Sequence, residues 1–289
     1  MRISGRTKIY GIIGDPVEHT LSPTMHNAAF NELELDFICV PFRVKKKELG
    51  RAMDSVRCLR IQGLNVTMPH KNAVVQYLDE LDSTAKFVRA VNTVLNDSGR
   101  LKGFNTDGIG ALRALRENGF NPHGKKMLLL GAGGAARAIA FHASQEVEEL
   151  VILNRTGKEA ENSAGDLRKK FNERVIGDSL SAERIKNELK DTDILINATS
   201  VGMHPNAGES LVLPEWLRND LCVMDIVYHP LETKLVEHAK AKGAKIVSGI
   251  EMLVYQGAAS FEIWTSHPAP IKTMKKAVLN KILEMETIN

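Results

Sequence analysis

The feature that most constrains this chain is an apolar run that stops abruptly at a cluster of glycines. The segment KKMLLLGAGGAARAIAFHA (125–143) begins as a buried strand, turns at Gly131 and continues as an alanine-rich helix. Glycine accepts a tight turn, and alanine favours the helix that follows. A strand, a turn and a helix in this order are typical of a parallel sheet with helices packed on its faces.

The same alternation continues towards the C-terminus. Strand-like runs recur in ELVILNRT (149–156), DILINATSVGM (193–203), CVMDIVYHP (222–230) and AKIVSG (244–249). Each run is followed by a turn or a helical stretch, as parallel strands require. We therefore predict a doubly wound, Rossmann-type α/β domain for this part of the chain.

The N-terminal part predicts a second domain, which is also mainly parallel α/β. Strand-like runs are KIYGIIG (8–14), FICVPFRV (37–44) and IQGLNVT (61–67). Ser22 suits the N-cap of a helix, with Pro23 at its first position. The apolar residues from Val74 to Leu81, after Pro69, have helical spacing and predict another helix.

Two further patterns mark where the domains join. AVNTVLND and RLKGFNTD flank Ser98-Gly99 and predict a hairpin, after which a helix runs from Asp107 to a stop at Gly119. Two helical segments, 250–265 and 270–286, end the chain. We predict a substrate-binding domain of residues 1–106 plus 249–289, and a dinucleotide-binding domain of residues 107–248.

Composition excludes several classes of protein. The 289 residues are 43% hydrophobic and 25% charged, with a net charge of +3, so nothing requires a nucleic-acid partner. No apolar run reaches the roughly 18 residues of a membrane span, and the N-terminus lacks the pattern of a signal peptide. Three widely spaced cysteines indicate reduced thiols and a cytoplasmic protein. The basic run Arg43 to Lys47 indicates a solvated face or mild steering of an anionic ligand.

The glycine cluster has the spacing of a dinucleotide-binding turn. Gly131, Gly133 and Ala136 fit G-x-G-x-x-A between a strand and a helix. The first glycine permits the turn, the second lets the backbone approach a pyrophosphate, and the small third residue lets helix and strand pack closely. Amide groups at the start of the helix then bind the phosphates. Plain strand–helix connections also use glycine turns, but this context favours a dinucleotide site.

The next strand discriminates between the two nicotinamide cofactors. It ends at Asn154, 23 residues after Gly131, where NAD-binding units usually carry an acid that binds the ribose. Here Arg155, Thr156 and Lys158 offer two cations and a hydroxyl instead. These side chains either form a solvated turn or bind a 2′-phosphate, and we predict NADP as the cofactor.

An ammonium and a carboxylate on separate loops suit proton transfer. Lys71 ends NVTMPHK after a strand, and Asp107 lies in FNTDG. Lys71 lies where a helix is expected to begin, an unfavourable place for a cation. The alternatives are an ordinary surface lysine and an N-cap aspartate. Proton transfer beside a hydride carrier predicts the interconversion of an alcohol and a ketone.

Several other polar residues are ambiguous when taken alone. Thr20 and Ser22 place two hydroxyls in one loop, either as ligand contacts or as a turn and a helix cap. Asn92 is polar within a strand-like run, so it is either paired in the core or faces a cleft. Tyr228 and Gln256 are equally open, and together these groups suit a polyhydroxylated ligand. No His, Cys and carboxylate cluster has metal-site spacing, and we expect His26 and His70 to be structural.

In combination these segments resemble the shikimate dehydrogenase family almost from end to end. The matching segments are HTLSPTMHN, NVTMPHK, AVNTV, GFNTDG, GAGGAAR, NRT, NATSVGM, MDIVYHPLET and GIEMLVYQGA. The resemblance implies an NADP-dependent enzyme that interconverts 3-dehydroshikimate and shikimate in aromatic amino-acid biosynthesis. It also implies an N-terminal substrate domain that the C-terminal helices rejoin.

The resemblance implies a role for each matching residue. Lys71 and Asp107 correspond to the catalytic pair. The substrate-binding positions are Thr20, Ser22, Thr67, Asn92, Tyr228 and Gln256. The positions that bind the cofactor phosphates and ribose are Gly131, Ala132, Gly133, Gly134, Ala135, Asn154, Arg155, Thr156 and Lys158. The positions beside the nicotinamide are Thr199, Ser200, Val201, Ile226, Gly249 and Met252.

The chain departs from the family pattern at two positions. Thr20 stands where the family usually has serine, which keeps the hydroxyl and adds a methyl group. Glu159 stands where a second basic residue is usual, with Lys158 one position earlier. The alternatives are a quinate/shikimate dehydrogenase that uses both NAD and NADP, a non-catalytic dinucleotide-sensing module, and another two-domain Rossmann reductase. We expect a monomer or homodimer with a small-molecule substrate.

Overall fold

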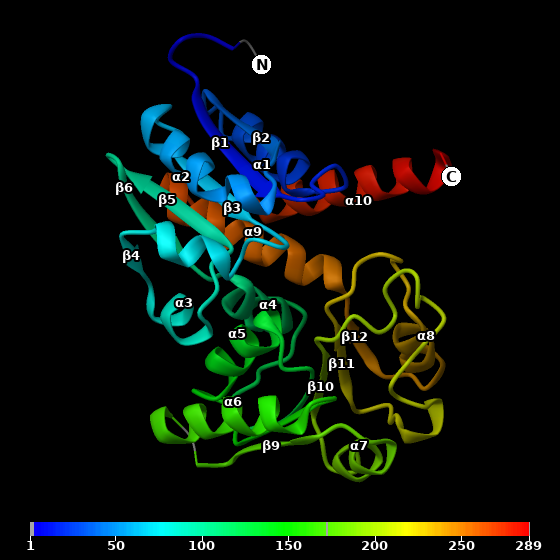
Figure 1. The fold of residues 1–289 in the computed structure, drawn as a ribbon. Coiled ribbons are helices and arrows are strands. Elements are labelled where there is room, and N and C mark those ends of the chain that lie inside the picture. Colours follow the sequence, from blue (N-terminus) through cyan, green and yellow to red (C-terminus); the bar gives the residue numbers. More distant parts are fainter. Residues whose placement is uncertain (1–2, 172, 289) are drawn as a thin grey trace. The chain divides into compact units, whose positions relative to one another are not determined.

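The computed structural model describes residues 3–171 and 173–288 (Figure 1). The chain divides into two compact units. The first unit comprises the residues up to Thr106 together with those from Val254 onward, and the second unit is Asp107–Leu253. One division falls where helix α4 begins and the other falls inside helix α9. Within the described residues, every helix is too short or too polar to span a bilayer.

The first unit is built on a six-stranded mixed sheet. Its strands are β1 (Lys8–Gly14), β2 (Phe37–Arg43), β3 (Gly63–Val66), β4 (Glu80–Leu81), β5 (Thr93–Asp97) and β6 (Arg100–Phe104). The order is β2-β1-β3-β5-β6-β4. β1 is parallel to β2 and β3, β4 is parallel to β6, and β5 is antiparallel to both of its neighbours. The prediction of a mainly parallel α/β domain is confirmed.

Helices cover the two faces of this sheet. They are α1 (Ser22–Glu32), α2 (Leu49–Cys58), α3 (Ser83–Val88), α9 (Gly249–Thr265) and α10 (Ile271–Ile288), with 3₁₀ turns η1 (Lys46–Glu48) and η2 (Ala73–Tyr77). Successive side chains of a strand point to opposite faces. In β3, Leu64 and Val66 join the aliphatic core with α2, whereas Asn65 bonds to residues of α1 and α9 on the other face. That second face also holds the aromatic side chains of Tyr10 and Trp264.

Two local predictions for the first unit are wrong. Ser22 is the first residue of α1 rather than its N-cap; Leu21 holds the N-cap position, and no side chain caps the helix. The helix expected after Pro69 is only the 3₁₀ turn η2, because Leu78 is extended and Leu81 lies in β4. Pairing with β6 therefore overrides the helical spacing of these apolar residues.

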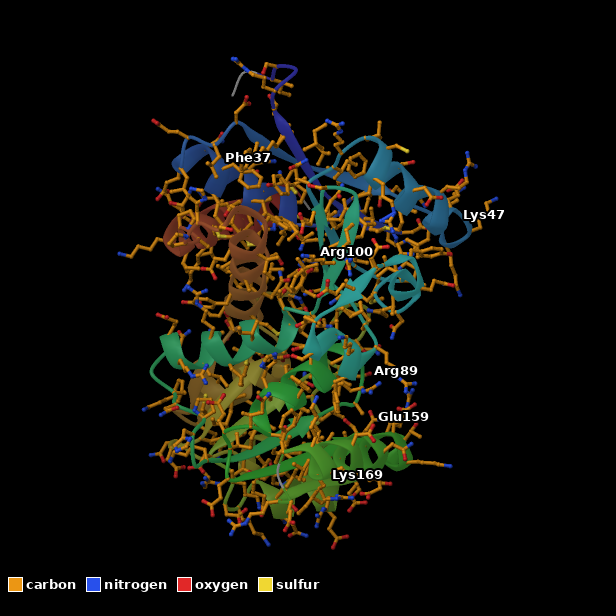
Figure 2. The ribbon with its side chains drawn as sticks, turned by 90° about the vertical axis from the view of Figure 1, so that its left-hand side faces the viewer. Phe37, Lys47, Arg89, Arg100, Glu159 and Lys169 are labelled. Carbon is orange, nitrogen blue, oxygen red and sulfur yellow. The ribbon has the colours of Figure 1, made fainter. Side chains whose placement is uncertain are left out.

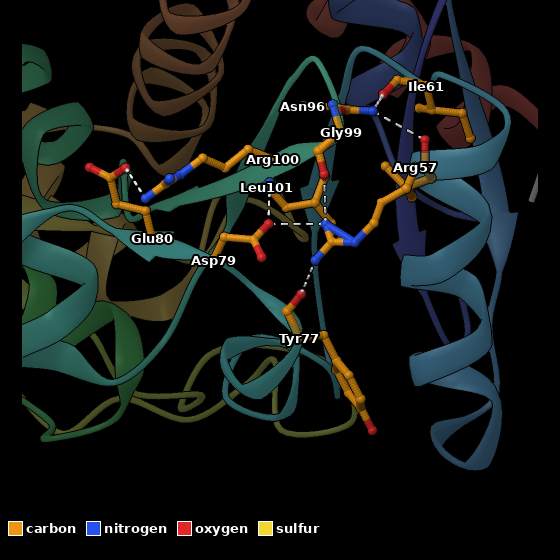
Figure 3. A network of polar contacts seen from close by, with 10 residues as sticks. Arg57, Ile61, Tyr77, Asp79, Glu80, Asn96, Gly99, Arg100 and Leu101 are labelled. Carbon is orange, nitrogen blue, oxygen red and sulfur yellow. Dashed lines mark hydrogen bonds and ion pairs between the residues drawn. The ribbon is translucent and has the colours of Figure 1, made fainter.

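A polar network shows what holds that segment extended (Figure 3). The Asp79 carboxylate accepts a hydrogen bond from the Leu101 amide at 2.6 Å and pairs with Arg57 at 3.1 Å. The Arg57 guanidinium also donates to the carbonyl oxygens of Tyr77 and Gly99. One side chain of α2 thus joins the end of η2 to the tip of the β5–β6 hairpin.

The hairpin and the helix that follows it are confirmed. β5 and β6 pair from Thr93↔Phe104 to Asp97↔Arg100, and Ser98 and Gly99 both have positive φ, as the tight turn requires. Helix α4 (Asp107–Glu117) follows, and Gly119 has a φ of 84°, which fits its place just beyond the helix end.

The second unit is a parallel six-stranded sheet. Its strands are β7 (Lys126–Leu130), β8 (Glu149–Asn154), β9 (Val175–Ser179), β10 (Ile194–Asn197), β11 (Cys222–Asp225) and β12 (Lys245–Val247). The order β12-β11-β10-β7-β8-β9 places the switch point of the doubly wound sheet between β7 and β10. The Rossmann-type prediction is confirmed. β9 was not predicted because it is half exposed and lacks an apolar run.

The helices of the second unit alternate with its strands. They are α4, α5 (Gly134–Ala143), α6 (Gly157–Lys170), α7 (Ala182–Glu188), η3 (Pro214–Trp216), α8 (Lys234–Ala241) and the first residues of α9. Aliphatic side chains from four of the strands form a continuous core with α7 and α8. This core fixes the strand ends from which the polar loops emerge.

Candidate active site

The loop after β7 is a glycine turn that brings two strand ends together. Gly131 has a φ of 111°, and its amide donates to the Leu153 carbonyl at 2.7 Å. A Cβ atom at Gly131 would lie 2.8 Å from the carbonyl oxygen of Ala198, the residue after β10. Both the positive φ and this close approach require glycine.

The next glycines leave the backbone open at the start of α5. Gly133 is the N-cap, and neither it nor Gly134 would bring a Cβ atom within 4 Å of another residue. Both are exposed, whereas Ala136 is buried against the sheet. The first amides of a helix have no intrahelical acceptor and attract anions. The turn therefore fits a dinucleotide pyrophosphate, as the sequence pattern predicts.

The loop after β8 carries the groups that would distinguish NADP from NAD. The Asn154 side-chain amide donates to the Glu159 carboxylate at 2.8 Å and to the Thr156 carbonyl at 3.2 Å. Arg155 and Lys158 are exposed, and neither pairs with an acid among the described residues. Two cations and one fixed carboxylate therefore surround the N-terminus of α6, where Figure 2 labels Glu159.

Asn197 organises the loop after β10. Its side-chain oxygen accepts hydrogen bonds from the amide and the hydroxyl of Thr199, and its amide nitrogen donates to the Val201 carbonyl. The Thr199 hydroxyl oxygen also accepts from the Val201 amide at 3.2 Å. The loop that contains Thr199, Ser200 and Val201 is thus held by one buried amide. Ser200 is the exposed member of the three.

Asp225 joins this loop to the loop after β11. Its carboxylate is fully buried and accepts from the Asn197 side chain at 3.0 Å, the Val227 amide at 3.1 Å and the Thr233 hydroxyl at 2.6 Å. Burial raises the pKa of Asp225, and these three donors act in the opposite direction. The buried acid therefore fixes the backbone on both sides of Ile226.

Gly249, Met252 and Tyr228 are three further predicted site residues, and they lie at the start of α9 or just after the loop that follows β11. A Cβ atom at Gly249 would lie 2.5 Å from the Val227 carbonyl, so glycine allows α9 to start against that loop. Met252 is buried one turn further along α9. Tyr228 follows the loop and is 37% exposed; it belongs to the second unit, unlike the other predicted substrate residues.

In the first unit, Thr67 and Lys71 lie in the turn that follows β3. The Thr67 amide donates to the Ile13 carbonyl, and the Lys71 carbonyl accepts from the Val91 amide at 2.8 Å. Lys71 is partly buried. The expectation that a helix dipole acts on this lysine is wrong, because the chain forms only the five-residue turn η2 beyond it.

Thr20 and Ser22 lie together in the loop before α1. The Ser22 amide is 3.4 Å from the Thr20 hydroxyl oxygen, and Ser22 is buried while Thr20 is partly exposed. Asp107 begins the second unit as the first residue of α4 and is 5% exposed. The next residue, Gly108, packs against the backbone of Ala138 in α5, which fixes the start of α4.

Asn92 is almost fully buried, and its side chain forms hydrogen bonds with Thr106, just before α4, and with Gln256 in α9. Its side-chain oxygen accepts from the amide of Thr106 at 2.9 Å, which identifies that atom as the oxygen. Its amide nitrogen donates to the Thr106 hydroxyl at 2.9 Å and to the Gln256 side chain at 3.3 Å. The structure therefore brings two of the predicted substrate residues, Asn92 and Gln256, together.

A buried chain of polar side chains continues from Asn92 into the unit. The Ser260 hydroxyl lies 2.7 Å from that of Thr93 and 3.2 Å from the Asn65 amide nitrogen. That nitrogen also faces the Asn92 carbonyl, so the Asn65 oxygen is the atom 3.0 Å from Nε2 of His26. Since this oxygen can only accept, His26 carries its proton on Nε2. Burial lowers the pKa of His26 to about 4.

Sequence reasoning missed most of these supporting residues. Asn65 and Asn197 begin Asn-Xaa-Thr triplets, and each lies at or near the end of a buried strand. A polar amide inside an apolar run was the available signal, since buried amides are almost always paired. Asp225 gave the same kind of signal, as a carboxylate inside the apolar run CVMDIV, whereas Ser260 gave none. His70 is buried, with Nε2 2.6 Å from the Val44 carbonyl oxygen, and a structural role for it stays a prediction. No group of three potential metal ligands occurs among the described residues.

The doubly wound sheet and its glycine turn define the second unit as that of a dinucleotide-binding protein. Three family models match the chain. One described as the shikimate dehydrogenase substrate binding domain matches residues 12–94, one described as shikimate/quinate 5-dehydrogenase matches residues 114–215, and one described as the shikimate 5′-dehydrogenase C-terminal domain matches residues 249–279.

Individual relatives extend the match over the whole chain. A shikimate dehydrogenase (NADP⁺) of Methanopyrus kandleri is 48% identical over 283 residues, which is 97% of this chain and 98% of the relative. A crystal structure of a shikimate dehydrogenase in complex with NADP⁺ has a TM-score of 0.91 at 42% identity and covers 97% of this chain and 98% of that one. A shikimate 5-dehydrogenase from Listeria monocytogenes, in complex with shikimate and NAD, has a TM-score of 0.91 at 41% identity and covers 96% and 98%. The chain belongs to the shikimate dehydrogenase family.

Proposed function

We propose that this chain is an NADP-dependent oxidoreductase that interconverts 3-dehydroshikimate and shikimate. The observation that carries this proposal is the open glycine turn at the N-terminus of α5, in a chain that belongs to the shikimate dehydrogenase family. NADP, when bound there, supplies or accepts the hydride. Three widely spaced cysteines support a role in the reducing cytoplasm.

The second unit offers residues for each part of the cofactor. The turn from Gly131 to Ala135 would hold the pyrophosphate on backbone amides. Asn154, Thr156 and the two exposed cations, Arg155 and Lys158, would hold the ribose and its 2′-phosphate. The remaining proposed residues line the nicotinamide side: Thr199, Ser200, Val201, Ile226, Gly249 and Met252.

We assign substrate binding to the first unit, with a boundary at Asp107. Thr20, Ser22, Thr67, Asn92 and Gln256 would hydrogen-bond the hydroxyls and the carboxylate, with Tyr228 contributed by the second unit. The contact between Asn92 and Gln256 supports this proposal because it orders two amide side chains before substrate binds. Ordered donors lose little entropy on binding.

Lys71 and Asp107 would exchange the proton with the substrate oxygen. In the direction of reduction, the pair supplies a proton to the oxygen of the keto group as it becomes a hydroxyl. In oxidation the same pair removes that proton. General acid–base groups of this kind contribute about 10²- to 10⁴-fold to the rate.

One experiment separates this function from its alternatives. Initial rates are measured with shikimate and quinate, each with NADP⁺ and NAD⁺. We expect the highest kcat/KM with shikimate and NADP⁺. Comparable rates with quinate would favour a dual-specificity quinate/shikimate dehydrogenase, and no turnover with any pair would favour a non-catalytic dinucleotide-sensing module.

A substitution tests the proton-transfer role. Lys71→Ala should lower kcat about 10²-fold or more with a smaller change in KM, because the ammonium acts in the transition state. Lys86→Ala is the matched control, since Lys86 is an exposed lysine of the same unit, on α3. Near-normal turnover by a folded Lys71→Ala enzyme would exclude this role.

A further inference from the structure

We propose that Glu159 sets the cofactor selectivity of this chain by weakening the binding of the 2′-phosphate of NADP and allowing NAD to bind. This inference rests on the proposed dinucleotide site. It concerns one charge at the edge of that site, at the N-terminus of α6. Figure 2 shows Glu159 on this helix.

The Glu159 carboxylate is held in place at the end of β8. Asn154 is the last residue of β8, and its side-chain amide donates to Glu159 Oε2 at 2.8 Å. The Asn154 carbonyl in turn accepts from the Leu180 amide at 2.9 Å, so the residue that holds the carboxylate is itself fixed by the chain after β9. The Glu159 carboxylate is therefore held beside the end of β8.

The backbone that carries Glu159 has little freedom to move away. A Cβ atom at Gly157 would lie 2.1 Å from the Ser179 hydroxyl oxygen and 3.0 Å from the Ser179 amide, so α6 begins in close contact with the end of β9. The Glu159 amide donates to the Thr156 carbonyl at 3.0 Å and closes the first turn. The backbone that carries Glu159 is thus held against the end of β9.

The charges around this turn oppose each other. Arg155 and Lys158 are exposed, without an acidic partner among the described residues, and attract a phosphate. The Glu159 carboxylate, held at the end of β8 by Asn154, would repel a phosphate bound there, since like charges close together in space raise the free energy of the bound state. A carboxylate at the end of this strand is also the group that accepts hydrogen bonds from the ribose hydroxyls of NAD.

A simpler role for Glu159 makes a different prediction. Acidic residues in the first turn stabilise a helix through its dipole. If that were the only role, removing the charge would lower stability and leave the relative affinities for 2′-phosphorylated and unphosphorylated ligands unchanged. Glu183 offers a matched control, because it is an exposed glutamate in the first turn of α7 in the same unit.

The test measures the binding of adenosine fragments that lack the reacting ring. Dissociation constants for adenosine 2′,5′-bisphosphate and for 5′-AMP are measured by calorimetry for the wild type, Glu159→Gln, Glu159→Lys and Glu183→Gln. We expect Glu159→Gln to bind the bisphosphate about two- to fivefold more tightly, the range of an exposed charge pair. Glu159→Lys should add a similar factor. Binding of 5′-AMP should stay the same or weaken, and Glu183→Gln should match the wild type.

The possible outcomes separate this inference from the proposed reaction. Equal changes for both ligands, weaker binding of the bisphosphate, or no binding by any variant would overturn the role of Glu159. If Glu159→Gln binds the bisphosphate more tightly but the protein does not oxidise shikimate, the role of Glu159 is supported and the proposed reaction is refuted. The gain should also shrink at high ionic strength, because exposed charges are screened by salt.

Discussion

The buried histidine His26 makes the stability of the first unit depend on pH. His26 is fully buried between α1 and the sheet, and its Nε2 donates to the Asn65 oxygen at 3.0 Å. Its ring lies 4.8 Å from that of Trp264. Acidification is the perturbation, because a protonated imidazole in this place would put a charge in an apolar environment.

The structure gives the sign and size of the effect. Burial lowers the pKa of His26 from about 6.5 to about 4. Between these two values the unfolded chain binds a proton that the folded chain does not, so acid favours unfolding. At about 1.4 kcal/mol per pH unit, the full contribution of His26 is about 3 kcal/mol. It is present above pH 6.5 and is lost as the pH falls through the folded pKa.

The two tryptophans allow this loss to be assigned to the first unit. Trp264 lies in the first unit and Trp216 in the second, so a Trp216→Phe background leaves one reporter beside His26. Urea unfolding followed by its fluorescence at several pH values between 7.5 and 4 gives the free energy of unfolding at each pH. We expect the free energy of unfolding to fall by up to about 3 kcal/mol between pH 7.5 and 4 because of the protonation of His26 in the unfolded chain.

A substitution isolates the contribution of His26 from those of other groups. His26→Gln keeps a donor for Asn65 and does not titrate, so its stability should depend less on pH by the same amount. His267→Gln removes an exposed histidine of the same unit and should behave like the wild type. If the wild type and His26→Gln lose stability equally on acidification, the reasoning about burial is wrong.

Two further substitutions test the buried polar residues that support the site. Asp225→Asn should lower the free energy of unfolding by about 1–3 kcal/mol, because a donor replaces an acceptor of three hydrogen bonds. Since burial raises the pKa of Asp225, this deficit should shrink as the pH rises above about 4; a constant deficit in urea unfolding would contradict that. Ser260→Ala should cost about 1–3 kcal/mol and raise KM for shikimate more than it lowers kcat. The exposed Ser266→Ala is its control, and unchanged kinetics in Ser260→Ala would refute the link to Asn92.

Local patterns predicted the doubly wound sheet, the β5–β6 hairpin and the glycine turn. In each case the physical cause lies within a few residues: apolar runs for the strands, Ser98-Gly99 for the hairpin turn, and Gly131 for a positive φ beside Ala198. The family resemblance in turn supplied the site residues, including Lys71 and Asp107, that single motifs left ambiguous.

One of the two wrong local predictions has a clear tertiary cause. The residues after Pro69 have helical spacing, but Arg57 and Leu101, distant in sequence, hold Asp79 so that β4 pairs with β6. Ser22 had the composition of an N-cap, but the helix starts one residue earlier than that role requires. Contacts outside the local window therefore decided the first outcome.

The sequence by itself determined most of the strands of both sheets, the dinucleotide turn and the family, because these depend on residues that are neighbours in the chain. Only the tertiary structure decided which polar groups support the site. Asn65 and Ser260 are 195 residues apart, yet they share a hydrogen bond because β3 and α9 pack on one face of the sheet. Asp225 and Asn197 meet because their parallel strands are neighbours. Hydrogen bonds of this kind form only after folding has brought the elements together, so no local pattern encodes them.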